Sequence, residues 1–179
     1  MAVRKKSETI HLRVQPLSKL LLEGLANAAK TTSTSIIEDL ILEAAQKAEV
    51  VDVDDMIDDR LLRNGKLSLT DALTAAFHPD EPILTKLRTY YLADNALGYR
   101  ESLIASTILH LPEFFSGDQE IFSAKEKIIK EEYFHQVPRV NLEKIAESMS
   151  SLESFAAFKE KNPKLKTKYS DFLKMAELD

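Results

Sequence analysis

The pattern of hydrophobic and polar positions changes abruptly near the start of the chain. Across residues 9–15 the two kinds of residue alternate, with Ile10, Leu12 and Val14 apolar and their neighbours polar. This period of two predicts a half-buried β-strand. Pro16 ends the pattern, because proline cannot donate to a β-ladder and its fixed φ suits the first residue of a helix.

Beyond Pro16 the apolar residues follow a helical period. Positions 17, 20, 21, 25 and 28 share one face and predict a helix from Pro16 to about Lys30. Gly24 lies inside it and marks either a close contact with another helix or a weak point. After a polar stretch, positions 37, 40, 41, 44 and 48 predict a second helix that ends near Ala48.

The second helix begins within a cluster of serine and threonine residues. Ser33 is one candidate for its N-cap. Ser35 is the other, because Ser35 and Glu38 have the spacing of a capping box. The sequence does not separate the two.

One strand and two helices do not complete a fold by themselves. A lone strand has two bare edges, and roughly 45 residues bury too little apolar surface to be stable alone. The simplest solution is a symmetric dimer in which two copies of residues 9–15 pair antiparallel above four helices. The first unit is therefore predicted to be a homodimer or part of a higher homo-oligomer.

These residues resemble the ribbon-helix-helix DNA-binding family of the Arc, MetJ and CopG type. The strand IHLRV, then Pro16, then the TSTSII run at residues 32–37 look like that family's strand and the start of its second helix. The run LILEAAQKA is also similar to ribbon-helix-helix antitoxins that partner acetyltransferase toxins. The resemblance covers residues 9–48 and implies an intertwined dimer that binds double-stranded DNA.

In such a dimer, the side chains on the outer face of the strand enter the major groove. The candidate base-reading residues are Thr9, His11 and Arg13. Arginine suits the two acceptors of guanine, and threonine serves several bases. The candidate phosphate-binding residues are Arg4, Lys5, Lys6, Gln15, Ser33, Thr34 and Ser35. The alternatives are an ordinary exposed strand face, a solvated basic tail and plain helix capping.

The distribution of charge along the chain supports DNA binding, although the net charge of the whole chain does not. The chain of 179 residues has a net charge of −5, which is unusual for a DNA-binding protein. Residues 1–13 nevertheless hold four basic residues and one acidic residue, whereas residues 51–179 hold 17 basic and 23 acidic residues. Basic charge is thus concentrated beside the predicted strand.

Composition excludes several classes of protein. The absence of cysteine rules out disulfides and thiolate metal sites and fits the cytoplasm. No apolar run approaches the length of a membrane span, and the first residues lack the apolar core of a signal peptide. The histidines are scattered, and no nucleophile motif or Gly-rich phosphate loop is present. We therefore expect no enzyme activity, metal or cofactor.

Residues 51–179 predict an all-helical domain, separate from residues 1–50, with no competing strand signal. The acidic stretch of residues 52–63 is either a linker or a third helix, and Asn64-Gly65 is a turn. Further helices are predicted at residues 68–77, 81–97, 99–111, 119–136 and 141–162, with Asp80 and Asn141 as caps and a last short helix in the tail.

The mainly helical chain is thus expected to be a dimeric DNA-binding protein, most simply a transcriptional repressor. The helical domain would then sense an effector, oligomerise or recruit a partner. Two alternatives remain open: an antitoxin whose C-terminal part blocks a toxin, and a DNA-binding accessory of plasmid transfer, partition or another mobile element. In these alternatives the further partner is a toxin or a mobile-element protein.

Overall fold

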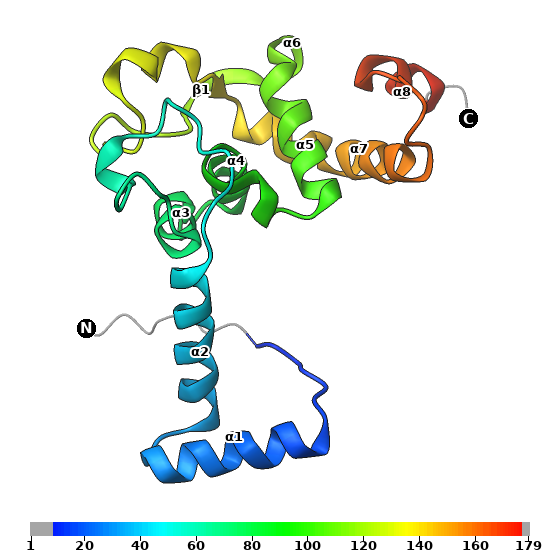
Figure 1. The fold of residues 1–179 in the computed structure, drawn as a ribbon. Coiled ribbons are helices and arrows are strands. Elements are labelled where there is room, and N and C mark those ends of the chain that lie inside the picture. The colour runs from blue at the N-terminus through cyan, green and yellow to red at the C-terminus, as the bar shows by residue number, and fades with distance from the viewer. Residues whose placement is uncertain (1–8, 177–179) are drawn as a thin grey trace, which may run out of the picture. The chain divides into compact units, whose positions relative to one another are not determined.

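The computed structural model of the chain describes residues 9–176 (Figure 1). The chain divides into two compact units, Met1–Ala44 and Ala45–Asp179, here called unit 1 and unit 2. The sequence placed this boundary after residue 50. The three basic residues at positions 4, 5 and 6 lie outside the described residues.

The two predicted helices are present, and both lie in unit 1 apart from the last three residues of the second. Helix α1 spans Pro16–Ala29 and ends where Lys30 adopts the left-handed conformation, with φ of 53°. Helix α2 begins at Ser33 and runs to Lys47. The cap of α2 is Thr32, whose Oγ1 accepts a hydrogen bond of 3.1 Å from the N–H of Ser35. Both predicted caps were therefore wrong, because Ser33 and Ser35 already lie inside the first turn.

Residues 9–15 have no regular secondary structure in the single chain. The predicted strand is therefore not formed here, and the ribbon-helix-helix arrangement stays a prediction. The physical reason is that a strand requires a neighbour to exchange backbone hydrogen bonds, and no segment among residues 9–176 pairs with this one. At the end of this segment the backbone of Gln15 is extended, with φ of −64° and ψ of 149°.

Unit 2 is mainly helical, but it is not the all-helical domain that was predicted, because it also contains a two-stranded sheet. Its α-helices are α3 (Leu69–Ala76), α4 (Pro82–Ala93), α5 (Tyr99–His110), α6 (Pro112–Phe115), α7 (Leu142–Lys161) and α8 (Tyr169–Ala176). Its short 3₁₀ turns are η1 (Asp59–Leu61), η2 (Asp94–Ala96) and η3 (Glu131–Gln136). Helix α4 packs against both α3 and α5, and α5 packs against α7 (Figure 1).

A single hydrophobic core holds these helices together. Its fully buried side chains come from every part of unit 2 and include Ile57, Leu67, Leu84, Leu87, Leu92, Phe115, Ile121, Phe122, Val140, Ile145 and Leu152. In contrast, Ala26 is the one buried hydrophobic residue within residues 9–44. The two units thus differ sharply in how much apolar surface each buries by itself.

Several local predictions for unit 2 are confirmed. The helix predicted at residues 68–77 is α3, which Ser68 caps by accepting a hydrogen bond from the N–H of Asp71. The predicted cap Asn141 accepts from the N–H of Lys144 at the start of α7. Asn64 and Gly65 have φ of 54° and 76°, as a tight hairpin turn requires. The predicted cap at Asp80 was wrong, because Glu81 occupies the N-cap position of α4 and makes no side-chain capping bond.

The predicted helix at residues 119–136 was wrong. Ser116–Glu120 forms strand β1, which pairs antiparallel with strand β2, Arg139–Val140. The segment between them is irregular until η3, yet the four isoleucine and phenylalanine side chains at positions 121, 122, 128 and 129 are buried. These side chains are buried by packing against the rest of unit 2 and not on the face of a helix. Their helical spacing in the sequence therefore gave a wrong prediction.

Residues 52–63 are neither a linker nor a helix. Ile57 is buried in the core, and Asp58 donates its backbone N–H to the carbonyl of Ile128. The turn η1 and isolated β-bridges at Ile57 and Arg63 are the ordered features of this segment. It is therefore an integral part of unit 2. Across the described part of the chain, no helix is both long and apolar enough to span a membrane.

Candidate nucleic-acid interface and a pocket in unit 2

The apolar residues of the 9–15 segment are exposed in the single chain. Ile10 is 71% exposed, Leu12 is 63% exposed and Val14 is 55% exposed. They alternate with polar residues, which are exposed as well. Three large apolar side chains at alternate positions thus stay largely exposed, because no other part of residues 9–176 packs over them.

The helices of unit 1 show the same property. Large apolar side chains that are about half exposed or more are Leu17, Leu20, Leu21 and Leu25 on α1, and Leu40, Ile41 and Leu42 on α2. On α1 these side chains recur at helical spacing, as the core-facing side of an amphipathic helix does. Exposed apolar surface of this extent usually marks an interaction site.

The candidate base-reading residues lie at alternate positions of one short segment. Thr9, His11 and Arg13 are all exposed. Arg13 has no ion-pair partner among the described residues. Its charge is therefore available to an external ligand.

The candidate phosphate contacts of unit 1 are found at two helix starts. Gln15 holds the N-cap position of α1 but makes no side-chain capping bond, so its amide is free for other contacts. Ser33, Thr34 and Ser35 form the first turn of α2. Free amide groups at a helix N-terminus favour anions. Thr32 was not among the predicted caps, although threonine is one of the favoured N-cap residues.

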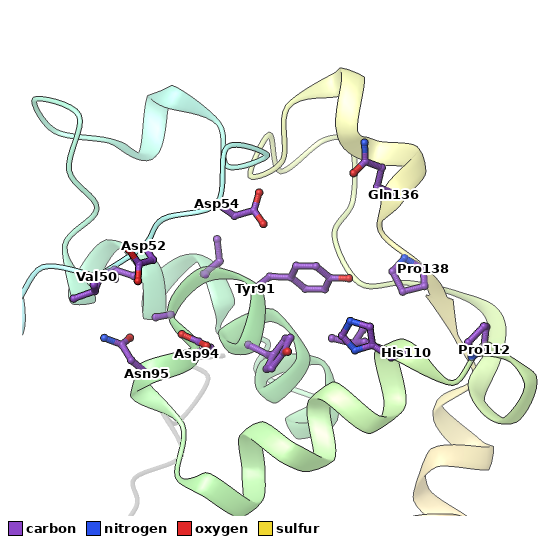
Figure 2. Close-up of a pocket in the computed structure, with 15 residues that line it drawn as sticks. Val50, Asp52, Asp54, Tyr91, Asp94, Asn95, His110, Pro112, Gln136 and Pro138 are labelled. Carbon is purple, nitrogen blue, oxygen red and sulfur yellow. The ribbon is translucent and has the colours of Figure 1, made fainter. Parts of the chain in front are cut away.

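Unit 2 contains a pocket that the sequence did not reveal (Figure 2). Its volume is about 780 Å³. It is lined by Val50, Val51, Asp52, Asp54, Tyr90, Tyr91, Leu92, Ala93, Asp94, Asn95, Leu109, His110, Pro112, Gln136 and Pro138. The lining comes from four separate parts of unit 2, so no local motif marks it.

The pocket is acidic and aromatic. Asp52, Asp54 and Asp94 have no salt-bridge partner within residues 9–176. Figure 2 shows the ring of Tyr91 extending into the pocket between Asp54 and His110. The pKa of Tyr91 is raised to about 12, mainly because its phenol is buried. The neighbouring phenol of Tyr90 and the Asp54 carboxylate raise this pKa further. Tyr91 therefore remains a neutral hydrogen-bonding group near neutral pH.

The imidazole of His110 contacts the backbone of its own helix, α5. Nδ1 of His110 lies 2.8 Å from the carbonyl oxygen of Ser106, and a proton on Nδ1 makes this contact a hydrogen bond. Its other ring nitrogen then stays an acceptor. No three His, Cys, Asp or Glu side chains among the described residues are grouped to hold a metal ion.

Comparison with known proteins adds no family to this description. No family model matches the chain, and no curated protein or solved structure matches it either. The ribbon-helix-helix resemblance therefore rests on the residues of the 9–48 segment themselves.

Proposed function

We propose that the chain is a dimeric, sequence-specific DNA-binding protein, most simply a transcriptional repressor. In this proposal, residues 9–15 of two copies pair as an antiparallel ribbon that enters the major groove. The observation that carries the proposal is the exposure of Ile10, Leu12 and Val14 at alternate positions, directly before two helices that also expose their apolar faces.

A second copy of the same chain is the partner that best fits this surface. A two-fold axis brings identical faces together, so every exposed apolar residue meets a complementary apolar surface. Each large side chain that becomes fully buried contributes roughly 1.5–3 kcal/mol. Pairing also satisfies the backbone groups of residues 9–14, which have no hydrogen-bond partner among the residues that the structure describes. Dimerisation would thus both bury the exposed apolar side chains of unit 1 and pair its free backbone groups.

In the same paired ribbon, the side chains that face away from the helices can contact the base edges of DNA. With the apolar side chains turned toward the helices, Thr9, His11 and Arg13 face outward on both strands, because strand side chains alternate. A guanidinium donates two parallel hydrogen bonds to guanine. Two-fold symmetry repeats each contact, so the preferred site is a pseudo-palindrome.

Phosphate contacts would then set the position of the dimer on the duplex. The first turn of α2 supplies Ser33, Thr34 and Ser35, and Gln15 lies at the end of the ribbon. Arg4, Lys5 and Lys6 precede the ribbon in sequence. Contacts of this kind fix register without choosing sequence.

Unit 2 fits a role as a folded sensing or partner-binding domain. Its core and its pocket of about 780 Å³ support this role, since effector sites are commonly concave and of this size. An antitoxin that represses its own operon and an accessory of a mobile element remain the alternatives. The folded core favours the accessory over an antitoxin tail that becomes ordered only on a toxin.

The test is selection of bound duplexes from a random-sequence library by the full-length protein. We expect an enriched site with two-fold symmetry, because a symmetric dimer places each base contact twice. Failure to enrich any sequence above the input, at low and moderate salt, would contradict the proposal. Enrichment of a site without symmetry would contradict the paired ribbon specifically.

A further inference from the structure

A basic segment lies at the end of α7, in an otherwise acidic unit. Residues 159–168, here called the lysine segment, read KEKNPKLKTK and hold five lysines and one glutamate. The remainder of unit 2 is rich in aspartate and glutamate. The lysine segment is therefore a second concentration of positive charge, distant in sequence from residues 9–15.

Two of its charged residues have partners within the protein. Nζ of Lys159 donates to the carbonyl oxygen of Leu165 at 2.7 Å. Arg100 donates from Nε to Oε2 of Glu160 at 2.8 Å. The one carboxylate of the segment is thus neutralised by an arginine from α5.

The other four lysines are exposed and unpaired. Lys161, Lys164, Lys166 and Lys168 are exposed, and none has a salt-bridge partner in the part of the chain that the structure describes. Lys161 lies in the last turn of α7, where a positive charge opposes the helix dipole. The other three lie beyond the helix, so the dipole does not explain them.

The backbone of the lysine segment is fixed at both ends. The N–H of Leu165 donates to the carbonyl of Asn162 at 3.1 Å, at the end of α7. Directly after the segment, Tyr169 is 3% exposed, and its hydroxyl lies 2.6 Å from Oγ of Ser151. Lys161 is thus presented from the end of α7 and the other three lysines from a loop held between α7 and Tyr169, which lowers the entropy cost of binding a ligand.

We propose that the lysine segment is a second DNA contact, which binds the phosphate backbone without reading sequence. This inference rests on the proposed function for its choice of ligand. The ammonium groups suit phosphates as point charges, and the segment lacks the arginine fork that recognises bases. A membrane surface fits less well, because Leu165 is the one large exposed apolar side chain in the segment.

The experiment measures binding of the full-length protein to a long duplex of arbitrary sequence at several salt concentrations. The test variant carries Lys161→Gln, Lys164→Gln, Lys166→Gln and Lys168→Gln. The matched control carries Lys125→Gln, Lys127→Gln, Lys144→Gln and Lys174→Gln, which removes the same charge from exposed positions of unit 2. Circular dichroism and thermal melting establish that both variants fold as the wild type does.

We expect the test variant to bind more weakly and with a shallower salt dependence. The slope of log K against log salt should flatten by about 0.9 for each lysine that contacts a phosphate. The control variant should keep the wild-type slope. Equal slopes for the wild type and the test variant would overturn the inference, as would unchanged DNA binding with lost binding to phosphatidylserine vesicles.

An Arg13→Ala variant separates this inference from the proposed function. If only the lysine-segment variant loses affinity for duplex, the inference stands and the ribbon is not the reader. If Arg13→Ala loses sequence preference while the lysine-segment variant binds as the wild type does, the proposed function stands and the inference fails. A wild-type protein that binds no duplex at low salt contradicts both.

Discussion

Arg88 and Glu126, which are 38 residues apart in sequence, form a bidentate ion pair. The two terminal nitrogens of Arg88 donate to the two carboxylate oxygens at 2.9 and 3.1 Å. Nε of Arg88 also donates to the carbonyl of Ile121 at 2.6 Å, and the arginine is only 5% exposed. This residue therefore ties the irregular 121–130 segment to α4.

Replacing Arg88 with alanine should destabilise unit 2. The change leaves the carbonyl of Ile121 and the Glu126 carboxylate without their donors, and removing one partner of a buried pair costs about 3–5 kcal/mol. We expect the lower end of that range, because Glu126 retains contact with water. Arg100→Ala is the control, since the exposed pair with Glu160 contributes about 0–1 kcal/mol. Urea unfolding of the two variants measures the difference, and equal losses would contradict the role of Arg88.

Gly117 is required where β1 passes close to the start of α7. A Cβ on Gly117 would lie 2.6 Å from the backbone N and Cα of Asn141. Gly117→Ala should therefore destabilise unit 2 by about 1–3 kcal/mol through overpacking. Gly24→Ala is the matched change, because a Cβ there meets nothing within 4 Å and alanine favours a helix by roughly 1 kcal/mol. A neutral Gly117→Ala, measured by thermal unfolding, would contradict the close approach.

Tyr91 should make the stability of unit 2 fall at high pH. Below pH 10 the phenol is neutral in both the folded and the unfolded chain, so it adds no pH dependence. Between pH 10 and about 12 the unfolded chain loses this proton while the folded chain keeps it, which favours unfolding. Tyr91→Phe should flatten this decline, and the phenolate absorbance of the wild type should show a late-titrating tyrosine. An unchanged decline in the variant would assign the effect to other groups.

Leu12→Glu should weaken self-association without weakening the fold of unit 2. Leu12 is 63% exposed in the single chain, so a charge there is tolerated unless a second copy covers it. Burying an unpaired carboxylate at a dimer interface should reduce association on the order of a hundredfold, which is roughly 3 kcal/mol. Phe77→Glu is the control, because Phe77 is equally exposed but lies in unit 2. Analytical ultracentrifugation that gives the wild type and Leu12→Glu the same mass would contradict the dimer.

Local signals in the sequence were sufficient for elements that local contacts define. Asn141 and the apolar spacing after it located α7, and Ser68 located α3, because capping and helical burial depend on neighbours in sequence. The turn at Asn64-Gly65 followed from the ability of both residues to adopt positive φ.

The elements that the sequence missed depend on distant contacts. Strand β1 exists because Arg139–Val140 pairs with it, and residues 121–130 are held in place by Arg88 from α4. No local sequence signal near β1 or near residues 121–130 identifies these distant partners. The pocket shares this property, since Asp54, Tyr91 and His110 come from separate segments. For residues 9–15, the predicted partner strand belongs to a second copy and is not part of the single chain.

The most direct test of the DNA-reading ribbon is binding of the wild type, Arg13→Ala and Lys5→Ala to a selected duplex and to its scrambled counterpart at several salt concentrations. Arg13→Ala should lose roughly 1–3 kcal/mol for each contact on the selected duplex and relax preference at symmetric positions. Lys5→Ala should weaken both duplexes alike and flatten the salt dependence. Equal loss by Arg13→Ala on both duplexes, or no binding of the wild type at low salt, would contradict the account.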